Sequence, residues 1–235
     1  MKLQLLHTLL NAASLVVRGS FHPDTSDGVP LLSNGNRART IVLAGNTGPD
    51  MWQTFVGSAE YRDEAPDPLD RWTQRVLQGI VAQLDTTGLV EPLYPFGGPP
   101  YLPFQRWAQR AEAVWSSPTG PLIHPDYGLW HAYRGALAFE DHLDLTEQLS
   151  TPSPCDSCTD QPCLQACPVD AFDGQSYDVP ACTDFMMTKS EGTACRLEGC
   201  LARRACPVGR SYTYSADQSE FHTGAFLRAR QGETG

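Results

Sequence analysis

The sequence lacks cysteine over its first two thirds. All eight cysteines of the 235 residues lie between Cys155 and Cys206. Positive charge is also scarce, with 17 Lys and Arg against 27 Asp and Glu and a formal net charge of -10. Binding to a nucleic-acid backbone normally depends on clustered Lys and Arg. The composition therefore predicts that nucleic acid is not a partner.

Long apolar runs are absent as well. Polar residues such as Gln4, His7 and Asn11 interrupt the N-terminal segment, which is unlike a secretory signal. No segment is long and apolar enough to span a bilayer, so we expect a cytoplasmic protein without a membrane partner. In that reducing compartment cysteines are predicted to be metal ligands rather than disulfides.

The cysteine-free part shows the periodicities of both helices and strands, which predicts an α+β fold. The expected helices cover 3–13, 67–84, 104–115 and a short segment at 221–226, and the expected strands cover 40–44, 89–94 and 128–139. Asp67 is expected to cap the second helix, with Pro68 at its first position. The proline-rich loop 94–103 is expected either to pack on its own domain or to line a cofactor. An acidic, then Ser/Pro-rich stretch at 140–154 predicts a boundary between domains 1–148 and 149–235.

The cysteines form two groups that each end in Cys-Pro. The first is Cys155-x2-Cys158-x4-Cys163-x3-Cys167-Pro168, and the second is Cys182 followed by Cys195-x4-Cys200-x5-Cys206-Pro207. Iron and sulfide are soft partners that thiolates bind well, so this pattern predicts two 4Fe-4S clusters. Two zinc sites are the main alternative, and a disulfide framework is a more distant one.

This part of the chain resembles two-cluster bacterial ferredoxins. It is more similar to the ferredoxin module of epoxyqueuosine reductases and reductive dehalogenases, which also have a lone cysteine between the groups. In two-cluster ferredoxins the cysteine before proline binds the other cluster. The resemblance therefore implies one cluster held by Cys155, Cys158, Cys163 and Cys206, and another held by Cys182, Cys195, Cys200 and Cys167. The spacing departs from the ferredoxin pattern, because Cys158 to Cys163 is two residues longer than usual.

The segment from Ile123 to Gly135 resembles one in the cobalamin-processing CblC (MMACHC) family, where His-Pro, an aromatic residue, Gly, Trp, Ala and Arg-Gly occupy the same relative positions. Asp67-Pro68-Leu69-Asp70 is similar to that family's Asp-Pro-x-Asp at the start of a long helix. The resemblance implies a nitroreductase-like domain that binds cobalamin base-off. The candidate cobalamin contacts are His124, Tyr127, Trp130 and Arg134.

These candidates have ordinary structural alternatives. His124 could be a satisfied histidine of the core or surface, Tyr127 and Trp130 could be wall residues, and Arg134 could pair with the acidic residues at 140–144. If 128–139 is one regular strand, Trp130, Ala132 and Arg134 share a face. No catalytic residue is assigned.

The two resemblances together predict an iron-sulfur redox protein. Its clusters would deliver single electrons to the cobalt of base-off cobalamin and generate cob(I)alamin for cobalamin processing or corrinoid-dependent reduction. The expected partners are cobalamin or a corrinoid-linked small-molecule substrate, and an upstream electron donor. The alternatives are an electron-transfer ferredoxin without corrinoid, or an enzyme like epoxyqueuosine reductase or reductive dehalogenase. Acidic charge, small size and the lack of appended tRNA-binding repeats disfavour the reductase, and the lack of a twin-arginine signal disfavours the dehalogenase.

Overall fold

The computed structural model describes residues 2–84, 88–146 and 151–232. Its contacts divide the chain into two compact units. The first comprises Met1–Ala113 and His131–Thr151, and the second comprises Val114–Trp130 and Pro152–Gly235. This division differs from the predicted boundary at residue 148, because the segment Val114–Trp130 groups with the cysteine-rich part of the chain.

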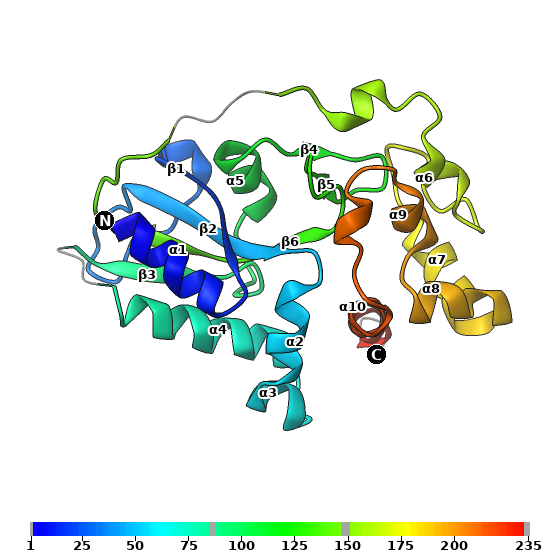
Figure 1. Ribbon diagram of the computed structural model, residues 1–235, viewed down its shortest axis with the longest axis horizontal. Helices are drawn as coiled ribbons and strands as arrows, with labels where there is room; N and C mark the ends of the chain where they lie inside the picture. The colour runs from blue at the N-terminus through cyan, green and yellow to red at the C-terminus, as the bar shows by residue number, and fades with distance from the viewer. Residues whose placement is uncertain (1, 85–87, 147–150, 233–235) are drawn as a thin grey trace. The chain divides into compact units, whose positions relative to one another are not determined.

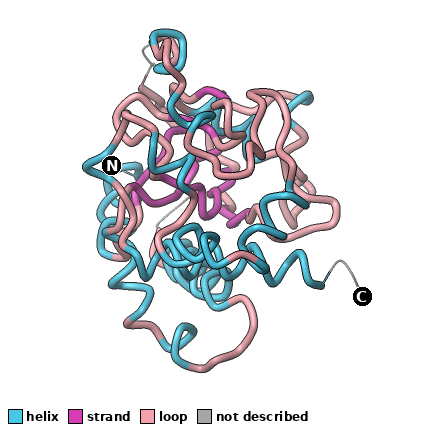
Figure 2. The backbone as a smooth tube through the Cα atoms, turned by 90° about the vertical axis from the view of Figure 1, so that its right-hand side faces the viewer, coloured by secondary structure: helices cyan, strands magenta, loops and turns pink. Residues whose placement is uncertain are grey.

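The first unit contains a four-stranded antiparallel sheet (Figure 1). Its strands, in spatial order, are β1 (Val16–Phe21), β2 (Thr40–Thr47), β6 (His131–Phe139) and β3 (Val90–Leu93). The helices of this unit are α1 (Lys2–Ala12), α2 (Asp50–Val56), α3 (Ala59–Arg62), α4 (Pro68–Val81) and α5 (Phe104–Ala111), with a 3₁₀ turn at Thr25–Asp27. Figure 2 shows the strands in magenta. The predicted α+β fold is confirmed.

Helices cover both faces of this sheet. A side chain on Gly135 of β6 would meet Leu77 of α4, so α4 covers that face. The Phe21 ring lies 6.5 Å from the Trp107 ring of α5. Phe21 of β1 pairs with Ile41 of β2, and Ile41 pairs with Ala138 of β6. Ala138 lies three residues after Gly135, so side chains at the two positions point to opposite faces. Because side chains alternate along a strand, α5 covers the opposite face.

Helix α4 forms where the sequence predicts it. Pro68 occupies its first turn, where a missing N–H costs no helical hydrogen bond. Leu69, Trp72, Leu77 and Ile80 are buried along one side of the helix. Asp67 precedes the helix in the left-handed conformation and its side chain makes no capping hydrogen bond, so the predicted cap is wrong.

Two strand and helix predictions need correction. The helix expected over 104–115 ends at Ala111, because Glu112 adopts an extended conformation and pairs with Arg18. Trp115 lies instead in a short strand of the second unit. The strand expected from Gly128 begins at His131, and β1 was not predicted at all.

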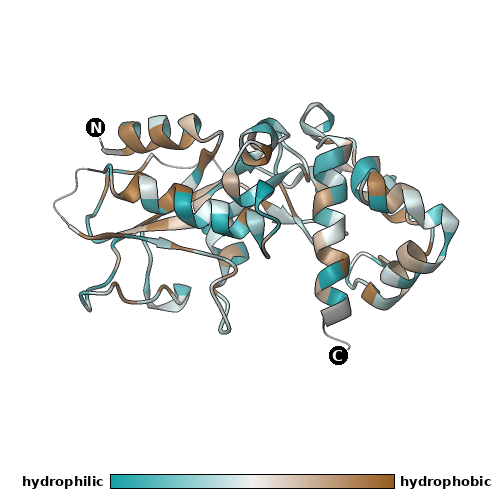
Figure 3. Cartoon of the chain, turned by 90° about the horizontal axis from the view of Figure 1, so that it is seen from below, coloured by the Kyte–Doolittle hydropathy of each residue, from teal (hydrophilic) through white to brown (hydrophobic). Residues whose placement is uncertain are grey.

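The second unit is built from short elements. They are β4 (Trp115–Ser116), β5 (Leu122–Ile123), α6 (Pro162–Gln165), α7 (Val179–Thr188), α8 (Thr193–Leu197), α9 (Leu201–Ala205) and α10 (Ala216–Gly232), with 3₁₀ turns at Pro154–Ser157, Ser190–Gly192 and Arg210–Tyr212. β4 and β5 pair in a two-stranded sheet, α6 contacts α9, and α10 contacts α8. Helix α10 contains the segment 221–226 and is longer than the short helix predicted there. Figure 3 shows hydrophobic and hydrophilic residues alternating along α10.

The proline-rich loop 94–103 belongs to the first unit and is irregular, as predicted. The Tyr94 and Phe96 rings stack at 5.2 Å and both are partly buried. Tyr101 is 67% exposed, so this side chain of the loop is not packed on the domain. In the described part of the chain, no helix has the length and apolarity that crossing a membrane requires.

Candidate functional site

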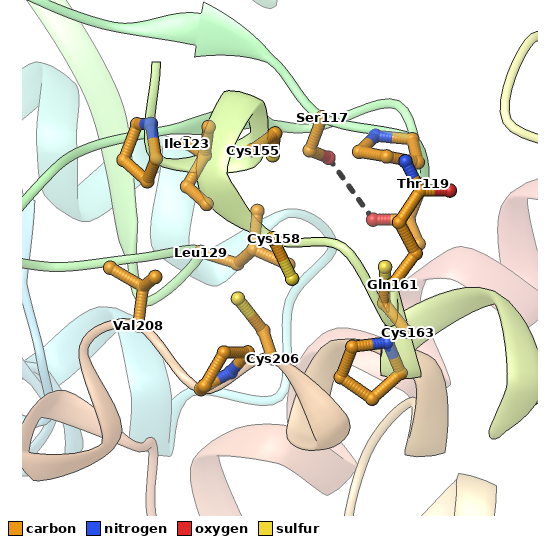
Figure 4. A pocket seen from close by; sticks show the side chains of 14 residues that line it. Ser117, Thr119, Ile123, Leu129, Cys155, Cys158, Gln161, Cys163, Cys206 and Val208 are labelled. Atoms are coloured by element: carbon orange, nitrogen blue, oxygen red, sulfur yellow. Dashed lines mark hydrogen bonds between the residues drawn. The ribbon is translucent and has the colours of Figure 1, made fainter. Parts of the chain in front are cut away.

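Four of the predicted cluster ligands line one pocket in the second unit. Cys155, Cys158, Cys163 and Cys206 lie around it, together with apolar side chains that include Ile123 and Leu129. Figure 4 shows the sulfur atoms of Cys158 and Cys206 turned toward each other. Cys206 is buried and packs with Ile123 and Leu129. Residues far apart in the sequence thus present four thiols to one largely apolar space.

Local backbone geometry positions the first three of these thiols. Cys155 and Cys158 share one 3₁₀ turn, in which the Cys158 N–H donates to the Cys155 carbonyl at 3.2 Å. Gln161 then turns the chain with a φ of 38°, and Pro162 starts α6 immediately before Cys163. The four residues between Cys158 and Cys163 thus bring the chain back to the pocket, which Gln161 and Pro162 also line.

Three of the other four cysteines pack together in a second place within the same unit. Cys167 forms a buried cluster with Ala171, Phe172 and Ala202, and Cys182 and Cys200 pack against it. The Ala171 N–H donates to the Cys167 sulfur at 3.3 Å. The Asp178 side chain caps α7, whose first turn contains Cys182.

Electrostatic neighbours divide the eight thiols in the same way. Burial raises the pKa of Cys155, with smaller increases from Cys206, Cys163 and Cys158. Burial likewise raises the pKa of Cys182, and Cys167 and Cys195 add to it. The pKa of Cys200 is raised by burial first and also by Cys182 and Cys195, while backbone N–H groups of Arg203 and Ala202 oppose the rise.

The thiol donors of each group suit an iron-sulfur cluster, which has several iron atoms to bind. Thiolates are the preferred ligands of iron-sulfur clusters, and N–H groups directed at sulfur stabilise the anionic form. The four thiols of the first group line one shared pocket.

Three predicted cobalamin contacts lie in the second unit, at or beside the hairpin that follows β5. The His124 and Tyr127 rings stack at 4.3 Å, and His124 Nδ1 accepts the Asp126 N–H at 3.0 Å. Trp130 is buried, and its ring lies 5.4 Å from that of Tyr214. These contacts give the three side chains structural partners, and their role toward cobalamin stays a prediction.

The same hairpin packs closely against the segment that follows Cys206-Pro207. Gly128 has a φ of 57°, and a Cβ there would lie 2.1 Å from the Val208 carbonyl oxygen. Only glycine allows this approach. The backbone at Gly128 therefore packs directly against the backbone at Val208.

Arg134 lies in the first unit, at a bulge where β6 pairs with β2. Ala44 faces Gly135 and Gly45 faces Tyr133, which leaves Arg134 opposite no residue. The bulge interrupts the alternation, and Trp130 precedes the strand, so the prediction of one face shared by Trp130, Ala132 and Arg134 is wrong.

The charge of Arg134 acts on Asp70, in the first turn of α4. Burial raises the pKa of Asp70, while Arg134 lowers it and Asp67 raises it. Two segments that carry the CblC resemblance, the Asp-Pro-x-Asp and the Arg-Gly, are thus electrostatic neighbours within one unit. Asp70 is a carboxylate partner that the sequence-based alternative for Arg134 did not include.

A buried charged network in the first unit was missed entirely. Arg18 is 1% exposed, and its Nη2 lies 2.8 Å from Glu112 Oε1. Its Nη1 donates to the Asn46 carbonyl at 3.2 Å, and the Tyr133 hydroxyl donates to Glu112. Burial raises the pKa of both Glu112 and Tyr133, and Arg18 opposes both shifts. Arg18 and Glu112 are 94 residues apart, so no local pattern connects them.

No family model matches the sequence, and no curated protein matches it. The fold is similar to that of a selenomethionine-labelled epoxyqueuosine reductase, at 16% identity and a TM-score of 0.53, covering 94% of this chain and 69% of that one. An epoxyqueuosine reductase from Streptococcus thermophilus matches at 17% identity and a TM-score of 0.50, covering 92% and 68%. The C. elegans B12-trafficking protein CblC, a human MMACHC homologue, matches at 15% identity and a TM-score of 0.53, covering 94% and 89%.

At these identities the likeness concerns the fold. It supports the predicted CblC-like fold, while the ferredoxin-like nature of the second unit stays a prediction. The predicted exclusion of nucleic acid is not supported, because a fold shared by epoxyqueuosine reductases and CblC does not select one class of substrate.

Proposed function

We propose that this protein holds two 4Fe-4S clusters in its second unit and delivers single electrons from them to a base-off cobalamin. The observation that carries the proposal is the division of eight thiols into two groups of four, one of which lines a single apolar pocket. Cys155, Cys158, Cys163 and Cys206 are the proposed ligands of one cluster. Cys167, Cys182, Cys195 and Cys200 are those of the other.

The chain's own residues prepare these sites. Apolar walls such as Ile123 and Leu129 limit water at the first group, and N–H donors to Cys167 and Cys200 stabilise anionic sulfur in the second. When bound, a reduced cluster supplies one electron and is itself oxidised, and cobalt(II) becomes cobalt(I). An upstream donor must return each electron to the clusters. Reduced thiols suit a cytoplasmic location.

The proposed cobalamin contact in the first unit is Arg134. His124, Tyr127 and Trp130 stay candidate contacts on the sequence resemblance alone. The fold likeness to a B12-trafficking protein supports a corrinoid as the acceptor. Arg134 and Asp70 form a charged pair of neighbours that can orient polar groups of a ligand. Binding cobalamin base-off would make reduction of its cobalt easier.

Anaerobic reconstitution tests the proposal. The full chain is loaded with iron and sulfide and mixed with cob(II)alamin, and electron paramagnetic resonance and visible spectra are recorded. We expect a base-off cobalt signal, and oxidation of dithionite-reduced clusters after excess dithionite is removed. Arg134→Met is expected to weaken cob(II)alamin binding at least tenfold, whereas Arg39→Met, at an exposed arginine of the same unit, should leave it unchanged.

Two results would contradict the proposal. Failure to bind iron and sulfide would remove the clusters from the function. Clusters that form but neither shift the cob(II)alamin spectrum nor lose electrons to it would leave an electron-transfer protein without corrinoid, and the first unit would then serve docking.

The likeness to epoxyqueuosine reductase supports a second candidate, an enzyme that uses the reduced corrinoid on a further substrate. An epoxide or another reducible group, on a small molecule or a nucleic acid, would then oxidise the clusters in the presence of cobalamin. Steady consumption of reductant that requires both cobalamin and such a substrate separates this candidate from cobalamin processing.

A further inference from the structure

A five-residue helix joins the two thiol groups of the second unit. Helix α9 runs from Leu201 to Ala205, directly between Cys200 and Cys206. Cys200 belongs to one group and Cys206 to the other. A charged side chain on this helix is therefore close in the chain to ligands of both proposed clusters.

Arg203 of this helix is fixed in place by three kinds of contact. Its Nε donates to the Leu129 carbonyl at 3.1 Å, and its Nη2 donates to the same oxygen. Its guanidinium carbon lies 4.4 Å from the Trp130 ring centroid and 4.6 Å from that of Tyr214. Both distances are within the range of cation–π attraction. Its backbone N–H also points to the Cys200 thiol.

The charge of Arg203 has no carboxylate partner within the described ranges. Its side chain contacts one carbonyl and two aromatic rings, and the residue is half-buried. The next residue, Arg204, also donates to a carbonyl, that of Glu198 at 3.0 Å, but differs in its exposure and in its carboxylate neighbour. It is exposed and lies 3.9 Å from Glu198. Helix α9 therefore carries Arg204, which is exposed and lies near a carboxylate, and Arg203, whose charge lies near two aromatic rings.

We propose that Arg203 raises the reduction potential of the cluster held by the first group, because its guanidinium contacts the carbonyl of Leu129, a residue that lines the pocket of that group. The inference rests on the proposed function only in requiring that the clusters be present. Reduction adds one negative charge to a cluster, and a nearby fixed positive charge stabilises that product. Arginine stays protonated at all relevant pH values, and the rings reduce its contact with water.

Potentiometric titration followed by electron paramagnetic resonance tests this proposal without cobalamin. In Arg203→Gln we expect the ratio of reduced to oxidised cluster at a fixed potential to fall at least tenfold, which is 59 mV for a one-electron couple. Arg203→Lys keeps the charge and should remain within about threefold of the parent ratio. Arg204→Gln removes the same formal charge from solvent and is the matched control, with an expected change below about threefold.

Iron and sulfide analysis separates loss of assembly from loss of tuning. If Arg203→Gln does not retain its clusters, Tyr214→Leu tests the same charge by exposing it to water, and its ratio should fall in the same direction. The proposal is overturned if Arg203→Gln or Tyr214→Leu keeps its clusters and shows the same reduction potential as the parent. It is also overturned if Arg203→Lys or Arg204→Gln shifts the potential as much as Arg203→Gln does. A parent protein that forms no clusters would instead refute the proposed function.

Discussion

Replacing Arg18 by methionine is expected to destabilise the first unit strongly. The substitution removes a charge that is 1% exposed and leaves the Glu112 carboxylate, 14% exposed, without the guanidinium 2.8 Å away. Breaking a buried ion pair by removing one partner costs about 3–5 kcal/mol of unfolding free energy. The Asn46 carbonyl loses a hydrogen bond as well. Urea unfolding followed by tryptophan fluorescence measures the change.

The cost is expected to depend on pH. Burial already raises the pKa of Glu112, and Arg18 opposes that rise, so the variant's Glu112 pKa should rise further. A folded-state pKa above the unfolded value makes ionisation a penalty, which grows as pH rises from the unfolded pKa toward the folded pKa. The destabilisation should therefore be smaller at about pH 5 than at about pH 8.

Two further variants make this reasoning refutable. Arg18→Met with Glu112→Gln removes both charges and should recover at least half of the loss at about pH 8. Arg39→Met makes the same change at an exposed position and should stay within about 0.5 kcal/mol of the parent. A cost below about 1 kcal/mol for Arg18→Met, or one independent of pH, would show that the pair is not stabilised as the geometry indicates.

Three other outcomes can be measured. Cys182→Ala should lose about half of the cluster iron and keep the spectrum of the cluster bound by the first group, since each cubane binds four cysteines; retention of all the iron would make Cys182 structural. Gly128→Ala should cost more than about 1 kcal/mol in thermal unfolding, because its φ of 57° and the Val208 oxygen 2.1 Å from the new Cβ both oppose a side chain. Gly120→Ala, with a φ of 96° but nothing within 4 Å, is its control and should cost less. Tyr94 should ionise only near pH 12 in an absorbance titration, since burial raises its pKa to about 12; ionisation near pH 10 would show a solvated ring.

Elements with a strong local signal were predictable from the sequence. The apolar run beginning at Thr40 forms the fully buried part of β2, and Pro68 with its following apolar residues forms α4. β1 was missed because Arg18 and Gly19 interrupt its pattern. Each is explained only by a partner far along the chain: Glu112 for Arg18, and the Ala111 carbonyl, which a side chain at position 19 would strike.

The candidate site was predictable where the residue type alone indicates the chemistry. Eight cysteines at these spacings predict metal ligation, and the grouping that the ferredoxin resemblance implies puts together the same four thiols that line the pocket. The partners of Arg203 and Arg134 were not predictable. Two aromatic rings 73 and 11 residues from Arg203 come together only in the fold, and the bulge at Arg134 arises from register between strands.

The interleaving of the two thiol groups imposes an order on synthesis. Cys155, Cys158 and Cys163 leave the ribosome early, yet the pocket that they line is completed by Cys206, fifty-one residues after Cys155. At elongation rates of about 5–20 residues per second this delay is about 3–10 s. The second group, from Cys167 to Cys200, is translated entirely within that interval. The nascent chain therefore exposes three early thiols to oxidants and to competing metals until its last cysteine emerges.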